Sequence, residues 1–402
     1  MSQQVLLTPS IITKESLVIL ENNLVAANRV NRKFENQFVK IGNSLTIRKP
    51  NRFTVASGPG LQVQDIAEPS VSITINNQRQ VAFQFTSQDL TLTVEEFSER
   101  YLKPAMAGMA NKIDFDVLQN FSAISNEVGT PGTTPSFFST SVQLVGQRQD
   151  ENAAPQDNRT LVLNPAAYWA ISNGLTGSFV MPTAKDALVK GYLATIGNYE
   201  IYMDQNIPTL STGVHVSTNA LLSNAPASQS GSSISTIGWA VSDTFTVGEV
   251  VTFGTVFAIN PQSRQSTGSL KNFVITSSLT VGATSTAVLQ ISPAIVTSGP
   301  YQNVSNGTAS TAGGKVSIVS GATATSSSFA QNMAFTRDAF GLVMVPLEIP
   351  QGVDFAARET YRNISMRVIR AYDINNDVFP TRIDTLYGTT VYYDELGCRL
   401  TG

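Results

Sequence analysis

One long stretch of this chain carries almost no charge. Ser, Thr, Gly, Ala and Val fill most positions between Ser211 and Gln331, which we call the low-charge block. Its only charged residues are Asp243, Glu249, Arg264, Lys271 and Lys315. Glycines and Ser/Thr clusters divide the block at roughly the 8–12-residue spacing of a sandwich or barrel. The pattern predicts a self-contained β domain inserted into a host fold, with strands at Gly238–Val241, Val250–Ile259, Lys271–Ser277, Ala287–Ile291 and Lys315–Ile318.

Length and charge limit what the host can be. The chain has 402 residues, and single cores rarely grow beyond roughly 250–300 residues, so we expect two or three domains. The 26 Lys+Arg and 29 Asp+Glu give a net charge of −3, which argues against a protein that clamps nucleic-acid phosphates with a basic face. Met1–Ser10 lacks a basic stretch followed by an apolar run, and no window approaches 18 uninterrupted apolar residues. We therefore expect no membrane contact, and a protein that is made and kept in the cytoplasm or released only by lysis.

Before the low-charge block, two helices flank an extended loop. Apolar residues from Leu17 to Phe38 recur at three- and four-residue steps, which predicts a helix with Thr13 as its N-cap that ends before Gly42. The segment Leu45–Leu92 alternates around turns and predicts an antiparallel loop. Its strands are expected at Thr46–Arg48, Phe53–Val55, Val71–Ile75 and Val81–Phe85. Because this loop has too few apolar residues for its own core, it has to lie on the rest of the chain or on a neighbouring copy.

The second helix is predicted from Thr93 to about Ile124. Thr93 and Glu96 have the spacing of a capping box, and Pro104 is expected to bend the helix near its start. Its apolar face is expected at Phe97, Tyr101, Ala105, Met109, Ile113, Val117 and Phe121.

A mixed α/β region follows, and strands end the chain. We expect strands at Leu161–Leu163 and Tyr199–Met203, and helices from Asn164 to Trp169 and over Asp186–Tyr192. After the low-charge block, apolar runs occur at Leu342–Leu347, Ile364–Ile369 and Leu386–Leu400, and the last two are expected to be strands.

The chain offers little catalytic chemistry. His215 is the single histidine, and no Gly-x-Ser-x-Gly elbow accompanies it, so a surface or loop histidine is the better interpretation. Cys398 is the single cysteine and is expected to be a small buried hydrophobe. A zinc site lacks His and Cys ligands. We therefore expect no enzyme activity, no catalytic residue, no metal site and no cofactor.

Three weaker patterns have structural explanations. Gly307–Val316 resembles a phosphate-binding loop, but Ala309 and Val316 stand where that loop needs Gly and a hydroxyl residue. Asp373–Asp377 begins like a calcium loop, but Val378 replaces the turn glycine and Asp384 the final Glu, which favours an Asx turn. The carboxylate pairs Glu95/Glu96 and Asp114/Asp116 fit a helix start or a solvated face.

The densest basic cluster lies in the extended loop and comprises Arg48, Lys49 and Arg52. Phe53 is its only aromatic neighbour, so nucleic-acid binding is a weak interpretation. Salt bridges to an acidic neighbour are the better one. The candidates for subunit contact are therefore these three residues together with Asp65 and Glu68.

Three groups of motifs carry a resemblance to a known family. The first is Asp89–Phe97 with Tyr101–Pro104. The second comprises Phe245–Glu249, Phe257–Pro261, Ser266–Gly268 and Phe273–Ile275. The third comprises Ala371–Asp377, Pro380, Arg382, Asp384 and Leu386–Gly388. In this order the chain resembles the major capsid proteins of tailed double-stranded DNA bacteriophages, and most closely the P22-like coat proteins, which carry an extra β-barrel.

The resemblance implies an α+β fold of the HK97 type with defined parts. These are an N-terminal arm (1–40), an extended loop (41–92), the spine helix of a peripheral domain (93–132), an axial domain (133–210), an inserted β-barrel (211–331) and return strands (332–402).

The resemblance also implies a function. Family members form pentamers and hexamers of an icosahedral shell, assemble with a scaffolding protein and a portal in the host cytoplasm, and enclose DNA by weak, non-specific contact. The partner of this chain is then chiefly itself, in the virion. The alternative is a secreted or surface β-rich carbohydrate-binding protein or hydrolase, which predicts an export signal and an exposed aromatic platform around Trp239.

Overall fold

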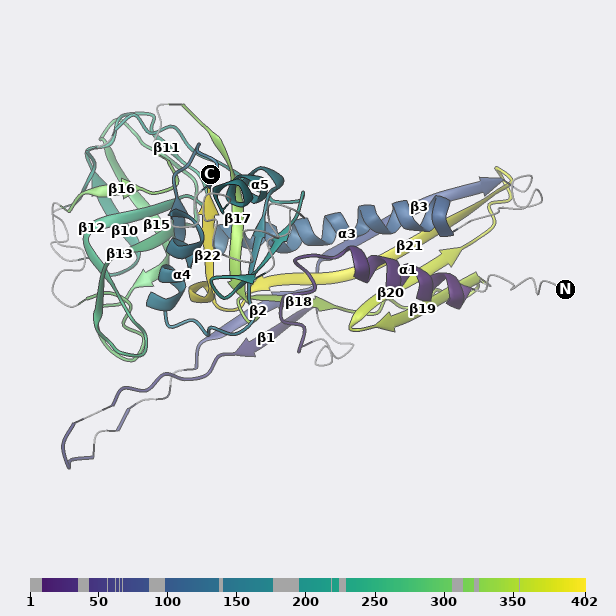
Figure 1. The fold of residues 1–402 in the computed structure, drawn as a ribbon, viewed down its shortest axis with the longest axis horizontal. Coiled ribbons are helices and arrows are strands. Elements are labelled where there is room, and N and C mark those ends of the chain that lie inside the picture. Colours follow the sequence, from purple (N-terminus) through teal and green to yellow (C-terminus); the bar gives the residue numbers. More distant parts are fainter. Residues whose placement is uncertain are drawn as a thin grey trace. The chain divides into compact units, whose positions relative to one another are not determined.

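The computed structural model describes the chain in two compact units (Figure 1). The described residues are 9–34, 43–55, 57–61, 63–64, 66, 68–86, 98–136, 140–175, 195–217, 219–223, 229–305, 314–321, 325–353 and 355–402. Unit 1 consists of Met1–Ile47, Ser70–Val117 and Phe340–Thr390. Unit 2 consists of Arg48–Pro69, Leu118–Ala339 and Val391–Gly402. Among the described helices, none combines the length and apolar character needed to cross a bilayer.

Unit 1 is built on a five-stranded antiparallel sheet. Its order is β18-β21-β20-β19, and β3 also pairs with β21. The strands are β3 (Asn77–Thr86), β18 (Phe340–Met344), β19 (Phe355–Tyr361), β20 (Ile364–Arg370) and β21 (Val378–Val391). Helix α1 (Pro9–Asn23) packs on β19 and β20, where Leu17 and Leu20 are buried. The strand predicted at Ile364–Ile369 is confirmed as β20, and β18 overlaps the apolar run Leu342–Leu347.

The first helix differs from its prediction at both ends. It begins at Pro9, whose fixed φ suits the first turn, so Thr13 is a buried residue inside the helix and not its N-cap. It ends at Asn23 because the Asp114 carboxylate accepts the next free backbone N–H groups, those of Val25 (2.7 Å) and Ala27 (2.8 Å). The apolar residues beyond Asn23 therefore reach the core without a helix; residues 35–42 lie outside the described part.

The second helix is confirmed from Ser98 onward. A π-helical turn, η2 (Ser98–Leu102), precedes α3 (Lys103–Leu118), and the 3₁₀ turn η3 (Gln119–Ala123) ends it beside Ile124 as predicted. The predicted capping box lies outside the described residues. The wide turn before Pro104 shifts the phase of the side chains, so the buried positions near the start are Leu102 and Met106 and not Tyr101 and Ala105.

The extended loop holds fewer strands than predicted. β1 (Ser44–Arg48) pairs with β2 (Ser70–Thr74), but Phe53–Val55 forms no strand. The stretch Val81–Phe85 was expected to run back within the loop. It lies in β3 instead, because β3 pairs with β21 along its whole length and satisfies its backbone there.

The host part of unit 2 is a mixed seven-stranded sheet. Its order is β4-β22-β17-β5-β7-β6, with β8 paired to β17. The strands are β4 (Glu127–Gly129), β5 (Arg159–Leu163), β6 (Thr195–Ile196), β7 (Tyr199–Met203), β8 (Thr209–Ser211), β17 (Ser328–Thr336) and β22 (Gly397–Thr401). β5 and β7, which lie side by side in parallel, confirm two predicted strands. The apolar run Leu386–Leu400 is two strands, β21 and β22, separated by η5 (Asp394–Leu396).

Two helices accompany this sheet. α5 (Pro165–Leu175) starts where predicted, with the Asn164 side chain accepting the Ala167 N–H at 2.9 Å, but it continues beyond Trp169. α4 (Val142–Glu151) packs on β22 and was not predicted, because Val142 and Val145 are its only buried aliphatic side chains. The helix predicted over Asp186–Tyr192 lies outside the described residues.

The low-charge block contains a six-stranded antiparallel sheet that closes on itself. Its order is β16-β12-β13-β15-β10-β9. The strands are β9 (Leu221–Leu222), β10 (Gly231–Ile237), β12 (Val250–Ile259), β13 (Ser266–Ile275), β15 (Thr286–Ile295) and β16 (Val316–Ile318). Hydrogen bonds from Leu222 N to Gly314 O and from Val316 N to Ala220 O, both 2.8 Å, join the two edges. The result is a small barrel.

The barrel encloses its own aromatic core. Phe253, Phe273, Trp239 and Phe245 are buried in it, and the last lies on β11 (Thr244–Phe245), which pairs with β14 (Leu279–Thr280). The strand predicted at Gly238–Val241 is wrong, since β10 ends one residue earlier and Gly238 turns the chain with a φ of +85°. The strand Val250–Ile259 is confirmed with its predicted bounds.

Candidate assembly surface and buried polar sites

The basic cluster predicted from the sequence divides between two environments. Arg48 pairs with Glu68 at 3.1 Å, and both side chains are exposed. Arg52 pairs with Glu395, which lies in η5, at 2.6 Å, and both are partly buried. Lys49 Nζ lies 4.8 Å from the centre of the Tyr393 ring, and burial lowers the pKa of this lysine. Asp65 lies outside the described residues.

The residues from Arg48 to Pro69, which we call the 48–69 loop, are held by polar contacts at their base. Asn51 accepts a hydrogen bond from the Tyr301 hydroxyl at 2.8 Å, which ties the loop to the low-charge block. Farther out, the Gln64 side chain accepts the Thr54 N–H at 2.8 Å and donates to the Thr54 carbonyl. The two segments of the loop are therefore fixed to each other without an apolar core.

The loop presents large apolar side chains to solvent. The exposed fractions are 64% for Phe53, 100% for Val55, 92% for Leu61, 84% for Val63 and 73% for Ile66. Contiguous exposed apolar patches that are larger than those on a typical soluble monomer mark interaction surfaces. We call these five residues the apolar loop surface. Sequence reasoning identified the loop as unable to bury itself but selected its charges, not these side chains, as the contact candidates.

His215 is not on the surface. It is 2% exposed, and its Nε2 lies 2.9 Å from Glu249 Oε1. The same carboxylate accepts the Gly213 N–H (2.7 Å) and the Thr246 N–H (2.8 Å). A buried acid next to the histidine was not visible in the sequence because they are 34 residues apart. The pair closes loops of the low-charge block.

Trp239 offers no platform for a carbohydrate. It is 3% exposed, it packs edge-on against Phe245, and its Nε1 donates to Thr236 at 2.7 Å. The alternative interpretation as a carbohydrate-binding protein required an exposed aromatic platform around Trp239, and Trp239 does not provide one.

The calcium-like motif is an exposed turn. Asp373 accepts hydrogen bonds from Asn375 N (3.0 Å) and from the Asn376 side chain (2.7 Å), which is an Asx turn as predicted. Within the described residues no group of three or more His, Cys, Asp or Glu could hold a metal ion. Most of the phosphate-loop-like segment, 306–313, lies outside them.

The Asp114/Asp116 pair is built into unit 1 and does not lie on a solvated face. Asp116 accepts hydrogen bonds from Arg79 (2.6 Å) and Tyr387 (2.7 Å), and Lys112 lies 2.8 Å away. Burial alone would raise the pKa of Asp116, but these donors outweigh it and hold the pKa below its usual range. The carboxylate connects α3 with β3 and β21.

A buried arginine connects the low-charge block to the host sheet of unit 2. Arg399 on β22 donates to the Ile124 carbonyl and, at 2.6 Å, to the Gly248 carbonyl. Glu127 lies 3.9 Å from Arg399 and accepts the Ser320 hydroxyl at 2.6 Å. Burial raises the pKa of Glu127. Gly248 and Ser320 belong to the block, so its attachment is a polar network that the sequence did not reveal.

Known proteins resemble this chain in sequence and in fold. The protein-family model described as P22 coat protein, gene protein 5, matches residues 2–402. A solved structure from Mycobacterium phage Che8 is similar with a TM-score of 0.50 at 13% identity, over 94% of this chain and 90% of that chain. The capsid of cyanophage P-SCSP1u has a TM-score of 0.44 at 11% identity, over 94% and 90%. No curated protein matches the chain.

The family match covers both units and the low-charge block, and the Che8 structure shows the same α+β fold over nearly the whole chain. The fold is thus that of the HK97-type capsid proteins, and the place of the protein is the virion. The chain belongs to the P22 coat protein family and is a major capsid protein that forms an icosahedral phage shell.

Proposed function

We propose that this coat protein assembles as pentamers and hexamers around double-stranded DNA, and that the 48–69 loop binds a neighbouring copy through its apolar surface. The observation that carries the proposal is the exposure of Phe53, Val55, Leu61, Val63 and Ile66 on a segment fixed by polar contacts. Burying one large aliphatic or aromatic side chain contributes about 1.5–3 kcal/mol. Repetition of this contact in every copy supplies a large total from modest parts.

The charges of the loop have separate roles in this proposal. Arg48 and Glu68 are exposed and can exchange partners across a subunit boundary. Arg52 and Lys49 instead hold the base of the loop against η5. Asp65 remains a candidate from the sequence alone.

The remaining parts follow the family arrangement. We assign residues 1–40 to an N-terminal arm, 41–92 to the extended loop and 93–132 to the spine of the peripheral domain. We assign 133–210 to the first part of the axial domain, 211–331 to an inserted barrel and 332–402 to return strands of the axial and peripheral domains. The barrel supports monomer folding and contacts between capsomers. A scaffolding protein and a portal act during assembly in the host cytoplasm, the packaged DNA is held weakly because the net charge is −3, and the protein performs no catalysis.

Charge substitutions on the apolar loop surface test the proposal. We expect Val55→Asp and Leu61→Asp to leave the circular dichroism spectrum and melting temperature of the monomer unchanged, since both side chains are exposed. Assembly measured by sedimentation and electron microscopy should fall at least tenfold. Ser57→Asp adds the same charge at an exposed polar position of the loop and should assemble normally. Normal shells from both apolar-site variants would contradict the proposed contact.

A further inference from the structure

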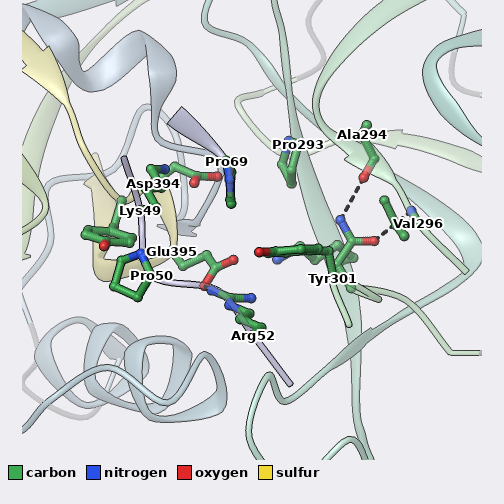
Figure 2. A pocket seen from close by; sticks show the side chains of 13 residues that line it. Lys49, Pro50, Arg52, Pro69, Pro293, Ala294, Val296, Tyr301, Asp394 and Glu395 are labelled. Atoms are coloured by element: carbon green, nitrogen blue, oxygen red, sulfur yellow. Dashed lines mark hydrogen bonds and ion pairs between the residues drawn. The ribbon is translucent and has the colours of Figure 1, made fainter. Parts of the chain in front are cut away.

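A charged cavity lies within unit 2, where the base of the 48–69 loop meets the low-charge block and η5 (Figure 2). Its volume is about 240 Å³, which is room for a small charged group and several waters, since one water occupies ~30 Å³ in the liquid. Pro50, Pro69 and Pro293 form part of its wall. Figure 2 shows the Arg52 and Glu395 side chains next to each other, with the Tyr301 ring extending toward them.

The five charged residues of the cavity are not matched in pairs. Lys49, Arg52 and Lys271 face Asp394 and Glu395, so the formal lining charge is +3 − 2 = +1. Arg52 and Glu395 form an ion pair at 2.6 Å. The charges left over are two lysines and one aspartate.

Lys271 is the most constrained of these residues. It lies on β13 with only 5% of its surface exposed, and its ammonium group has no hydrogen bond or ion pair within 4 Å among the described residues. It attracts Asp394 electrostatically from a greater distance. Its nitrogen is not among the fully buried atoms that lack a partner, so it faces the solvent of the cavity, where an anion can contact it directly.

Asp394 is not a close partner of the Lys271 ammonium group. Burial, and next the charge of Glu395, raise the pKa of Asp394, while the charges of Lys271 and Lys49 act in the opposite direction. Burial also lowers the pKa of Lys49. One further negative charge in the cavity would stabilise the ammonium groups of Lys49 and Lys271, which both line it.

We propose that this cavity binds a carboxylate, held by Lys49 and Lys271, and that a neighbouring copy of the chain supplies it in the assembled shell. This inference rests on the proposed assembly through the 48–69 loop. A carboxylate matches the room, the surplus positive charge and the donors of the two ammonium groups. The chain has more acidic than basic residues, 29 against 26, so neighbouring copies present such groups.

Acetate tests the chemistry of the cavity on the unassembled protein. Sodium acetate at ten times its Kd should raise the melting temperature by roughly 3 °C relative to sodium chloride of equal ionic strength. Lys271→Met, which keeps the length of the side chain without its charge, should abolish that rise. Lys315→Met removes an exposed lysine of the same block and should retain it. If Lys271→Met fails to fold, Lys49→Met serves the same purpose. An equal acetate response in wild type and the cavity variants overturns the proposal.

The shell identifies the source of the carboxylate. Cryo-electron microscopy of wild-type shells should show an acidic side chain of another copy between Lys49 and Lys271. Isolated density for a free anion would support the carboxylate chemistry and refute the neighbouring source. Shells with an empty cavity would overturn the whole inference while leaving the proposed assembly intact, whereas absence of shells would count against the proposed function.

Discussion

At the residue scale, the buried charges determine how distant segments are joined. Asp116 binds Arg79 and Tyr387, which are 37 and 271 residues away in the sequence. Periodicity identified α3 but could not reveal these partners, because it reports only which side of a helix is apolar. The same limit explains why His215 was expected outside the core. Cys398 was predicted correctly as a buried residue, because a free cysteine is usually buried and the end of the chain was expected to be a mostly apolar strand.

Replacing Asp116 with Asn tests this network. The variant keeps the shape of the side chain but loses its charge, so we expect about 3 kcal/mol less stability at pH 7. Because the folded pKa of Asp116 lies below the unfolded value near 3.9, the stabilisation is fully present above about pH 4 and disappears as the pH falls through the folded pKa. Urea unfolding between pH 3 and 7 measures the difference. Asp157→Asn, at an exposed position, should change stability little; a pH-independent loss in Asp116→Asn would refute the ionic origin.

At the element scale, the sequence predicted best those strands that are mostly apolar and bounded by turn residues. Tyr199–Met203 and Val250–Ile259 have the predicted bounds for this reason. The end of α1 and the place of β3 could not be predicted, because a carboxylate from α3 and a distant strand decide them. The contact residues were also incompletely predicted. The density of charge drew attention to the 48–69 loop, but only the fold shows that its apolar residues are exposed.

Two glycines of unit 1 should respond in opposite directions to Ala. A Cβ at Gly388 on β21 would lie 2.3 Å from the Thr74 carbonyl oxygen, so Gly388→Ala should cost roughly 1–3 kcal/mol. A Cβ at Gly108 in α3 meets nothing within 4 Å, so Gly108→Ala should add about 0.5–1 kcal/mol through helix propensity. Thermal unfolding of the two variants gives the comparison. A stabilised Gly388→Ala would mean that β2 does not approach β21 this closely.

The cap of α5 gives a smaller effect. Asn164→Ala removes the acceptor for the Ala167 N–H and should lower stability by about 1 kcal/mol. Asn164→Asp retains an acceptor oxygen and should recover most of the loss. Chemical denaturation measures the difference in stability. Equal destabilisation by both substitutions would indicate that the side-chain nitrogen of Asn164, and not its oxygen, provides the stabilising contact.

At the scale of the whole molecule, the low-charge block is attached to the rest of unit 2 by polar contacts at several places. Ser211 and Ser328 face each other across the β8–β17 ladder, with their hydroxyl oxygens 2.8 Å apart, so the chain enters and leaves the block at one place. Beyond this entry, Arg399 and Glu127 bind block residues from the host sheet. The barrel has its own core, and the host depends on the barrel to satisfy its buried charges.

Removing the block tests that dependence. We expect a variant in which Asn-Gly joins Ser211 to Ser328 to lose roughly 3–5 kcal/mol, because Arg399 loses the Gly248 carbonyl and Glu127 loses Ser320. Circular dichroism and sedimentation should then show poorly folded monomers and few or abnormally sized shells. Adding Arg399→Met and Glu127→Gln to the deletion removes the stranded charges and should restore part of the monomer stability. These substitutions do not replace the lost surface of the barrel. If the block also contributes contacts between capsomers, the rescued variant should therefore still fail to form normal shells. Normal infectious shells from the deletion alone would show that the host needs the block neither for folding nor for contacts between capsomers.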